Sequence, residues 1–260
     1  MNSTRRKLAI ATWGAPDEGS IYGKLQVDAG NLQQWIDDTR KASGEKVTVT
    51  HAVGKAVAMA LSQAPGINGR IVWGNYVPFD QTDITFLVAL DDGKDLAKVK
   101  IANLDKRPTT DIAAELKRRS EKLRQGKDDD FEKSKGLLKA LPTWVLRPLL
   151  KGIGWLTSSL GVSVPALGLE SFPFGSCIIT SVGMLGIDEA FAPHTPFARV
   201  PILVLVGAVR DTPVAKDGQV IVRPILTLTA TVDHRFVDGF ALAKVAGILR
   251  DTLEHPEGKL

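Results

Sequence analysis

A histidine and an aspartate stand four positions apart in the run Asp-His-Arg-Phe-Val-Asp-Gly, residues 233–239. His234 follows a stretch in which apolar residues alternate with threonines, so we expect it at the end of a strand. An imidazole exchanges a proton near neutral pH, which suits a general base. Asp238 and Gly239 indicate a tight turn with an oriented carboxylate. The spacing alone also arises by chance, so an ordinary surface histidine stays open as an alternative.

Several elements must position this run. The strand before His234 begins near Val220, after a hairpin turn over 215–218, and a closing helix is expected over 239–253. A second strand that carries hydroxyl groups is predicted over 176–182, and it contains Thr180 and Ser181. The remaining predicted strands cover 23–27, 71–77, 84–90 and 202–210, and the remaining helices cover 31–42, 47–61 and 110–125.

His51 falls in the first turn of the helix expected over 47–61, which Thr48 or Thr50 could cap. We interpret this histidine as structural or partly exposed, not as catalytic.

The composition excludes several kinds of site. One cysteine, Cys177, cannot form an intrachain disulfide or a cysteine metal cluster, which fits a reducing, cytoplasmic compartment. The four histidines are scattered, so no metal site is expected. The net charge of +4 comes from cations interleaved with acids, and no clustered basic patch with aromatic residues indicates nucleic-acid binding. The first residues contain no apolar core typical of a secretory signal.

The segment 136–169 is unusual. Apolar residues recur every four positions from Leu137 to Ile153, and basic or polar residues recur on the opposite helical face. Pro142 and Pro148 must divide or kink such a helix. A helical hairpin packed on its own domain or on a neighbouring subunit explains the pattern, and a membrane-surface element is the alternative.

With DHRFVDG, the sequence resembles the catalytic domain of the dihydrolipoamide acyltransferases, the core subunits of 2-oxoacid dehydrogenase complexes. It is more distantly similar to chloramphenicol acetyltransferase. The resemblance also rests on IITSVGMLG at 178–186, followed by a loop that contains proline and by an apolar strand, and on KAVAMAL, PGINGR and DITFLVAL upstream. It covers roughly 20–130 and 172–256. It implies an α/β fold, an α+β two-layer sandwich with a mixed sheet, packing helices and a helical insertion.

The resemblance also implies roles for individual residues. His234 is the general base, Thr180 is the hydroxyl that stabilises the oxyanion, and Ser181 is its adjacent fallback. Asp238 is structural and pairs with an arginine, for which Arg5 and Arg6 are candidates by analogy and Arg235 is a local alternative. Gly239 completes the turn. Coenzyme A or acyl-coenzyme A is the expected substrate, and its binding residues are not indicated.

In the family the histidine and the hydroxyl come from different subunits, so a homotrimer with active sites at its interfaces is expected. The sequence departs from the family pattern in three ways. We expect a single domain over 1–260 with an insertion at about 131–171 and without a lipoyl or subunit-binding domain. The N-terminal region matches poorly, and the C-terminus lacks the apolar tail that docks trimers into large cores.

Three functions therefore compete. The first is an acyltransferase whose acceptor is a thiol or a hydroxyl, for example on a lipoyl domain in trans. The second is a catalytically silent trimeric scaffold that keeps the fold. The third is an acyltransferase that associates with a membrane surface through 136–169.

Overall fold

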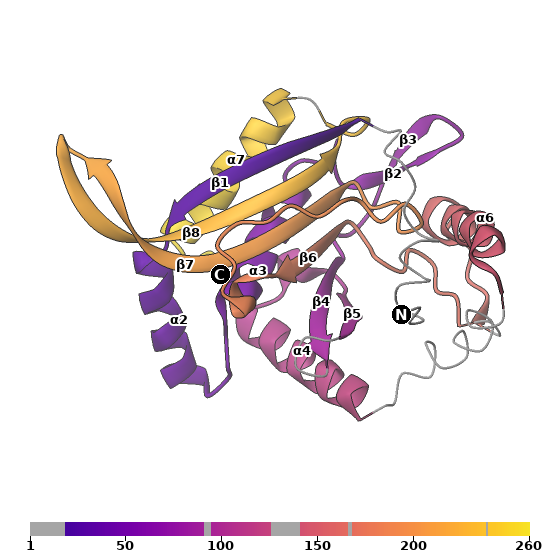
Figure 1. Cartoon of the computed structure of the whole chain (residues 1–260). Helices are drawn as coiled ribbons and strands as arrows, with labels where there is room; N and C mark the ends of the chain where they lie inside the picture. The colour runs from indigo at the N-terminus through magenta and orange to yellow at the C-terminus, as the bar shows by residue number, and fades with distance from the viewer. Residues whose placement is uncertain (1–18, 91–94, 126–140, 166–167, 238) are drawn as a thin grey trace.

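A six-stranded mixed sheet forms the centre of the computed structural model, which describes residues 19–90, 95–125, 141–165, 168–237 and 239–260 (Figure 1). The strand order is β1-β8-β7-β6-β4-β5. Strand β6 runs parallel to both β4 and β7, whereas the β1–β8, β7–β8 and β4–β5 pairs are antiparallel. The strands are β1 (Ser20–Asp28), β4 (Ile84–Leu90), β5 (Asp95–Ile101), β6 (Cys177–Ser181), β7 (Ile202–Lys216) and β8 (Gln219–Asp233).

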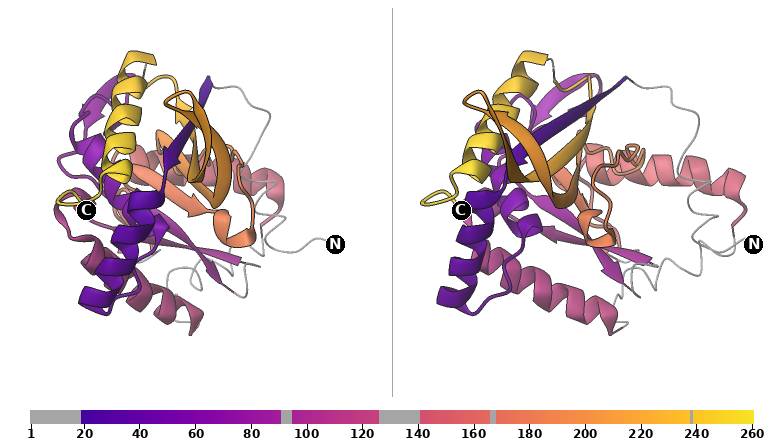
Figure 2. Two further views of the ribbon diagram at one scale, coloured as in Figure 1. Left: turned by 90° about the vertical axis from the view of Figure 1, so that its left-hand side faces the viewer. Right: turned by 60° about the vertical axis from the view of Figure 1, so that its left-hand side comes forward.

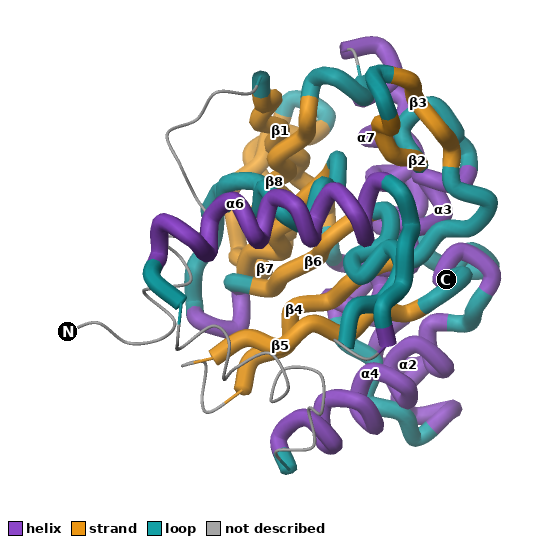
Figure 3. Tube along the Cα trace, turned by 90° about the vertical axis from the view of Figure 1, so that its right-hand side faces the viewer, coloured by secondary structure: helices purple, strands orange, loops and turns teal. Residues whose placement is uncertain are grey.

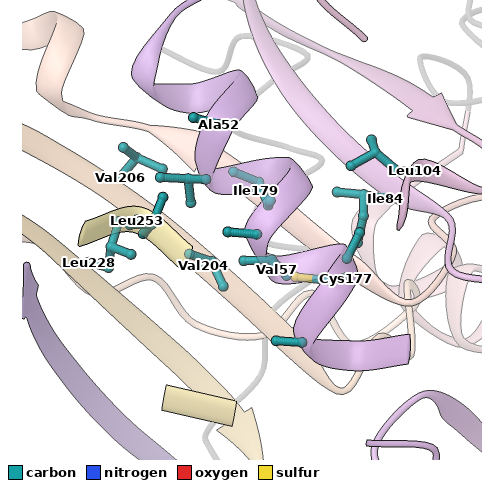
Figure 4. Packing of buried hydrophobic residues seen from close by; sticks show 14 of the residues in the cluster. Ala52, Val57, Ile84, Leu104, Cys177, Ile179, Val204, Val206, Leu228 and Leu253 are labelled. Atoms are coloured by element: carbon teal, nitrogen blue, oxygen red, sulfur yellow. The ribbon is translucent and has the colours of Figure 1, made fainter. Parts of the chain in front are cut away.

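Four helices pack on one face of this sheet: α2 (Gly30–Ser43), α3 (Val49–Ser62), α4 (Thr109–Arg124) and α7 (Gly239–Glu254) (Figure 2). Helix α3 is buried along most of its length, and its side chains meet those of β4, β6 and β7 (Figure 4). Gly54 allows this close approach, because a Cβ there would lie 2.4 Å from the Phe86 ring. The mixed sheet with packing helices confirms the predicted fold class.

The opposite face of β8 is covered by the loop that precedes β7. The hydroxyl of Thr231 donates to the Ala192 carbonyl at 2.7 Å, and Thr229 donates to the Ala190 carbonyl. The sequence pattern predicted a strand buried on one face only. Instead the threonines are buried as well, because their hydroxyls hold this loop against the sheet.

Strands β7 and β8 form a long hairpin whose outer part projects from the body of the molecule (Figure 1). The register shifts between Val206 and Val209, at a bulge that bends the ribbon. Its turn, Asp217-Gly218, has φ values of 52° and 77°, as a tight hairpin turn requires. Val220 and Val222 near the tip are 77% and 67% exposed.

One predicted strand is wrong, and one strand of the sheet was not predicted. The strand expected over 71–77 is a hairpin of two short strands, β2 (Gly69–Val72) and β3 (Asn75–Pro78). Trp73 and Gly74 form its turn with positive φ, which the apolar run concealed. Strand β5 was not predicted, although Ala97, Val99 and Ile101 alternate with lysines and are buried.

Within the unusual segment, the described residues contain one helix, α6 (Thr143–Gly154), followed by a π-helical turn at Trp155–Ser159 and a loop. The expected helical hairpin is therefore wrong for this described part, because Gly161 adopts positive φ and the chain then turns back in a bridge between Val164 and Leu169. Helix α6 lies apart from the four sheet-covering helices (Figure 3). Among the described residues, no helix combines the length and the apolar character that a membrane span requires.

Candidate active site

His234 lies directly after β8, at the end of the sheet. Its backbone N–H donates to the Gly19 carbonyl at 3.1 Å, next to the pairing of Ser20 with Asp233. The imidazole is exposed. The alternating pattern predicted the position of His234 at a strand end, and in the structure this strand end fixes its backbone and exposes the residue.

Asp233 and Arg235, the residues on either side of His234, form an ion pair with each other. Arg235 donates from Nε to Asp233 Oδ1 at 3.0 Å and from Nη2 to Asp233 Oδ2 at 2.5 Å, and its backbone N–H reaches Oδ1 at 3.0 Å. Burial acts to raise the pKa of Asp233, but the hydrogen bonds and charge of Arg235, with a contribution from the charge of His194, lower it overall. The turn around His234 is therefore held by a buried, ionised carboxylate.

The other residues of the predicted turn give less information. Asp238 lies outside the described residues, as do its candidate partners Arg5 and Arg6. Arg235, its local candidate partner, binds Asp233 as described above. Gly239 begins α7, and a Cβ added there would meet open space, so close packing does not require glycine at this position.

Thr180 and Ser181 form the last two positions of β6, and both are half-buried. Thr180 pairs with Leu87 of β4 and with Leu205 of β7. It therefore lies at the C-terminal end of β6, whereas His234 lies beyond the level of that strand's first residue. Thr180 of β6 pairs with Leu205 of β7, and Leu205 pairs with Thr229 of β8. Thr229 is five positions before His234.

This register separates the two predicted catalytic groups within one chain. Five residues of strand span roughly 16 Å, and crossing from β6 to β8 adds about 10 Å. A proton acceptor and an oxyanion donor must both lie within about 3 Å of the reacting atoms. His234 and Thr180 of the same chain cannot serve one carbonyl group.

A hollow of about 450 Å³ opens beside Ser181, and no motif in the sequence predicted it. The first turn of α3, including Thr48 and Thr50, forms part of its wall, and Arg40 and Arg210 border it. Arg210 is positioned by Asp188, to which its Nε donates at 2.6 Å. The hollow combines apolar strand atoms with two cations and the N-terminus of a helix, a combination that suits an anionic ligand with an extended arm.

His51, in the first turn of α3, has the structural role expected of it. Its Nδ1 accepts a hydrogen bond from the Thr48 N–H at 3.1 Å and so caps the helix. Burial and, to a smaller extent, the charge of Arg40 lower the pKa of His51 to about 4.

Comparisons with known proteins identify relatives of this chain. A model of the family "2-oxoacid dehydrogenases acyltransferase (catalytic domain)" matches residues 19–136 and 165–260. The dihydrolipoyllysine-residue succinyltransferase of the Saccharomyces cerevisiae 2-oxoglutarate dehydrogenase complex is 26% identical over 90% of this chain and 42% of its own length. The acetyltransferase of the Rickettsia bellii pyruvate dehydrogenase complex is 24% identical over 91% of this chain and 47% of its own. The chain thus spans less than half the length of these curated relatives.

Solved structures show the same fold. A probable dihydrolipoamide acetyltransferase from Listeria monocytogenes superimposes with a TM-score of 0.72 at 19% identity, covering 100% of this chain and 96% of that chain. The Azotobacter vinelandii dihydrolipoamide acetyltransferase has a TM-score of 0.68 at 21% identity over 97% of this chain and 86% of that chain. That structure addresses the role of a serine, a histidine and an asparagine in catalysis, and the last two stand four positions apart. The predicted family resemblance is confirmed.

Proposed function

Because the chain belongs to the family of 2-oxoacid dehydrogenase acyltransferase catalytic domains, we propose that it transfers an acyl group between coenzyme A and a thiol or hydroxyl acceptor, with His234 as the general base. The observation that carries this proposal is the exposed imidazole of His234 on a strand end whose backbone is fixed by Gly19 and whose flanking residues clamp each other. A base must be accessible to its substrate and rigidly placed, and this arrangement meets both conditions.

The reaction follows from the groups available. His234 takes the proton of the acceptor thiol, and the resulting thiolate attacks the carbonyl carbon of the acyl thioester. The carbonyl oxygen becomes an oxyanion, to which the Thr180 hydroxyl donates a hydrogen bond worth roughly 3 kcal/mol in the transition state. When the tetrahedral intermediate collapses, the bond to the leaving sulfur breaks and protonated His234 returns the proton to that sulfur.

The distance between His234 and Thr180 in one chain makes a second copy of the chain part of this proposal. In a homotrimer, His234 of one subunit meets Thr180 of the next. Exposed apolar side chains at both sites support such contacts: Phe240 beside the His234 turn is 84% exposed, and Met184 and Leu185 after β6 are 67% and 61% exposed. The cubic core of a pyruvate dehydrogenase complex, whose subunit covers 97% of this chain and 86% of its own with a TM-score of 0.68 at 22% identity, is a related assembly.

Coenzyme A fits the hollow beside Ser181. Its pantetheine arm needs an extended apolar channel, and its phosphates need cations at the entrance, which Arg40 and Arg210 provide. The acceptor thiol would then arrive from the side of His234, for example on a lipoyl group carried by another protein. In this proposal Asp238 has the structural role that the family resemblance implies.

A turnover assay tests the proposal. The release of free thiol from acetyl-, butyryl- and succinyl-coenzyme A is measured with dihydrolipoamide as acceptor, for the wild type and for His234→Ala. Loss of the base should lower kcat about 100- to 10,000-fold. His255→Ala is the matched control, since that histidine is 66% exposed at the end of α7 and far along the chain from the strand end.

The catalytically silent scaffold predicts a different result. It expects no turnover with any thioester and no binding of coenzyme A by calorimetry, and this combination would refute the enzyme proposal. Liposome flotation with and without residues 136–169 tests the membrane-surface alternative, which α6 keeps open by exposing Trp144, Arg147 and Lys151.

A further inference from the structure

A small cationic pocket lies behind the His234 turn. We call it the arginine pocket, and its volume is about 40 Å³. Arg70 of β2, Arg199 of the loop before β7 and Arg235 line it together with Ser159, His194 and Asp233. Among the described residues that line it, three carry a guanidinium group and one, Asp233, carries a carboxylate.

Arg70 is held in place by aromatic rings. Its guanidinium carbon lies 4.6 Å from the centre of the Phe172 ring and 5.6 Å from that of Phe79, and these two rings pack edge to face at 5.2 Å. Such stacking fixes the plane of the guanidinium but satisfies none of its N–H groups. The Nε of Arg70 is buried and has no hydrogen-bond partner within the described part of the chain. A fixed cation with an unsatisfied buried donor is ready to bind an acceptor.

The size of the pocket limits the ligand. About 40 Å³ holds roughly three water-sized groups, which suits a carboxylate or one face of a phosphate and excludes an aromatic ring or a long acyl chain. An oxyanion is also the acceptor that a planar guanidinium binds best.

The pocket is a particular feature of this chain. Ser159 is 1% exposed and belongs to the stretch 137–164, which the family model leaves unmatched. The π-helical turn that contains Ser159 is fastened nearby, because the Thr157 carbonyl accepts the Phe172 N–H at 3.1 Å and Trp155 packs against Trp73 at 5.3 Å. The unusual segment therefore builds one wall of the pocket and helps to place the ring that holds Arg70.

We propose that the arginine pocket is a subsite for an oxyanion, a carboxylate or a phosphate, carried by the acyl thioester that reacts at His234. This rests on the proposed acyltransferase function. The residues on either side of His234, Asp233 and Arg235, both line the pocket. A carboxylate at the end of a short dicarboxylic acyl chain would lie close to the reacting thioester, and a phosphate of the coenzyme is the second source of the same chemistry.

Matched substrates separate the two sources. Succinyl- and butyryl-coenzyme A carry four-carbon acyl chains that differ in a terminal carboxylate. For a carboxylate ligand, Arg70→Met lowers kcat/KM for succinyl-coenzyme A by roughly 10- to 100-fold and leaves that for butyryl-coenzyme A unchanged. For a phosphate ligand, the variant lowers both values equally and weakens the binding of coenzyme A but not of pantetheine. Arg118→Met, on the exposed side of α4, is the control.

A second measurement is independent of turnover. The midpoint of thermal unfolding is followed during titration with succinate and with inorganic phosphate at constant ionic strength. At least one anion should stabilise the wild type and Arg118→Met but not Arg70→Met. If no thioester reacts while this stabilisation is seen, the proposed function fails and the anion pocket stands.

The pocket proposal is overturned if Arg70→Met changes neither the substrate ratio nor coenzyme A binding, and neither anion stabilises the wild type through Arg70. Should Arg70→Met fail to fold, Arg70→Lys replaces it. This variant keeps a charge but loses the planar fork, so it should reduce the same ratio or anion effect several-fold, and an unchanged value again overturns the proposal.

Discussion

At the scale of single residues, His234 and His51 differ in exposure and in hydrogen bonding because their surroundings differ. His234 is exposed at a strand end, where it can meet a substrate. His51 is buried in the first turn of α3, where its Nδ1 accepts the Thr48 N–H. A buried imidazole that accepts a backbone hydrogen bond must stay neutral, and this ties the stability of the fold to pH.

The pH dependence of stability tests the role of His51. The unfolded chain takes up a proton on this residue near pH 6.5, whereas the folded chain does so only near pH 4. The contribution of His51 is therefore fully present above pH 6.5 and is lost as the pH falls towards 4, by up to about 3 kcal/mol in the free energy of unfolding. Urea denaturation across this range measures it.

His51→Gln isolates this effect from the carboxylates, because the wild type and the variant contain the same carboxylates. Glutamine can accept the same hydrogen bond from Thr48 but does not ionise. The difference in unfolding free energy between the wild type and this variant should change between pH 6.5 and 4. A constant difference over that range would show that His51 is not kept neutral.

At the scale of elements, the contact between α6 and the rest of the chain depends on a glycine. A Cβ at Gly154 would lie 2.2 Å from the Phe197 carbonyl oxygen, in the loop that covers β7 and β8. This backbone contact cannot give way as a flexible side chain would. It joins the unusual segment to the loop that also supplies His194 and Arg199 to the arginine pocket.

Two alanine substitutions in α6 test this contact. Gly154→Ala should lower the free energy of unfolding by about 1–3 kcal/mol, because the added methyl group forces the helix away from the loop. Gly152→Ala is the control in the same helix: a Cβ there meets nothing within 4 Å, so it should stabilise the protein by about 0.5–1 kcal/mol. Chemical denaturation of both variants gives the comparison, and equal effects would show that the contact is unimportant.

The elements also show what a sequence can predict. Helices with a clear apolar face, such as α2 and α4, were predicted to within two residues of their ends. The β2–β3 hairpin was missed because Trp73 takes positive φ within an apolar run, which local propensity does not reveal. His234 could be placed at a strand end by alternation alone. The distance between His234 and Thr180 could not be predicted from the sequence, because this distance depends on the register of β6, β7 and β8. The arginine pocket was equally hidden, since its cations come from distant parts of the chain.

At the scale of the whole molecule, the sheet separates His234 from Thr180 within one chain, so the proposed site needs two copies of the chain. The projecting β7–β8 hairpin, with its exposed valines, and the apolar side chains at the His234 and Thr180 ends offer surface for such contacts. A site shared between subunits has a property that a site within one subunit lacks, because two different defects can complement each other.

Mixed assemblies test this sharing. His234→Ala and Thr180→Val should each have low activity as homotrimers. When the two variants are unfolded together and refolded as a mixture, about one quarter of the interfaces combine an intact histidine with an intact threonine. Activity should recover towards that fraction of the wild type. Size-exclusion chromatography with light scattering establishes the trimer, and no recovery in a mixture shown to contain both chains would contradict a shared site.

The pairing of β1 with β8 has a consequence for how the chain acquires its structure. Ser20 pairs with Asp233, so the edge strand joins residues that are 213 positions apart in the sequence (233 − 20). Contacts between such distant residues form slowly, and during synthesis they must wait until the later partner has left the ribosome. The hydrogen bond that the His234 N–H donates to the Gly19 carbonyl belongs to this late pairing. The helices and strands that precede β8 can therefore assemble first, and the backbone of His234 is fixed in a later step of folding.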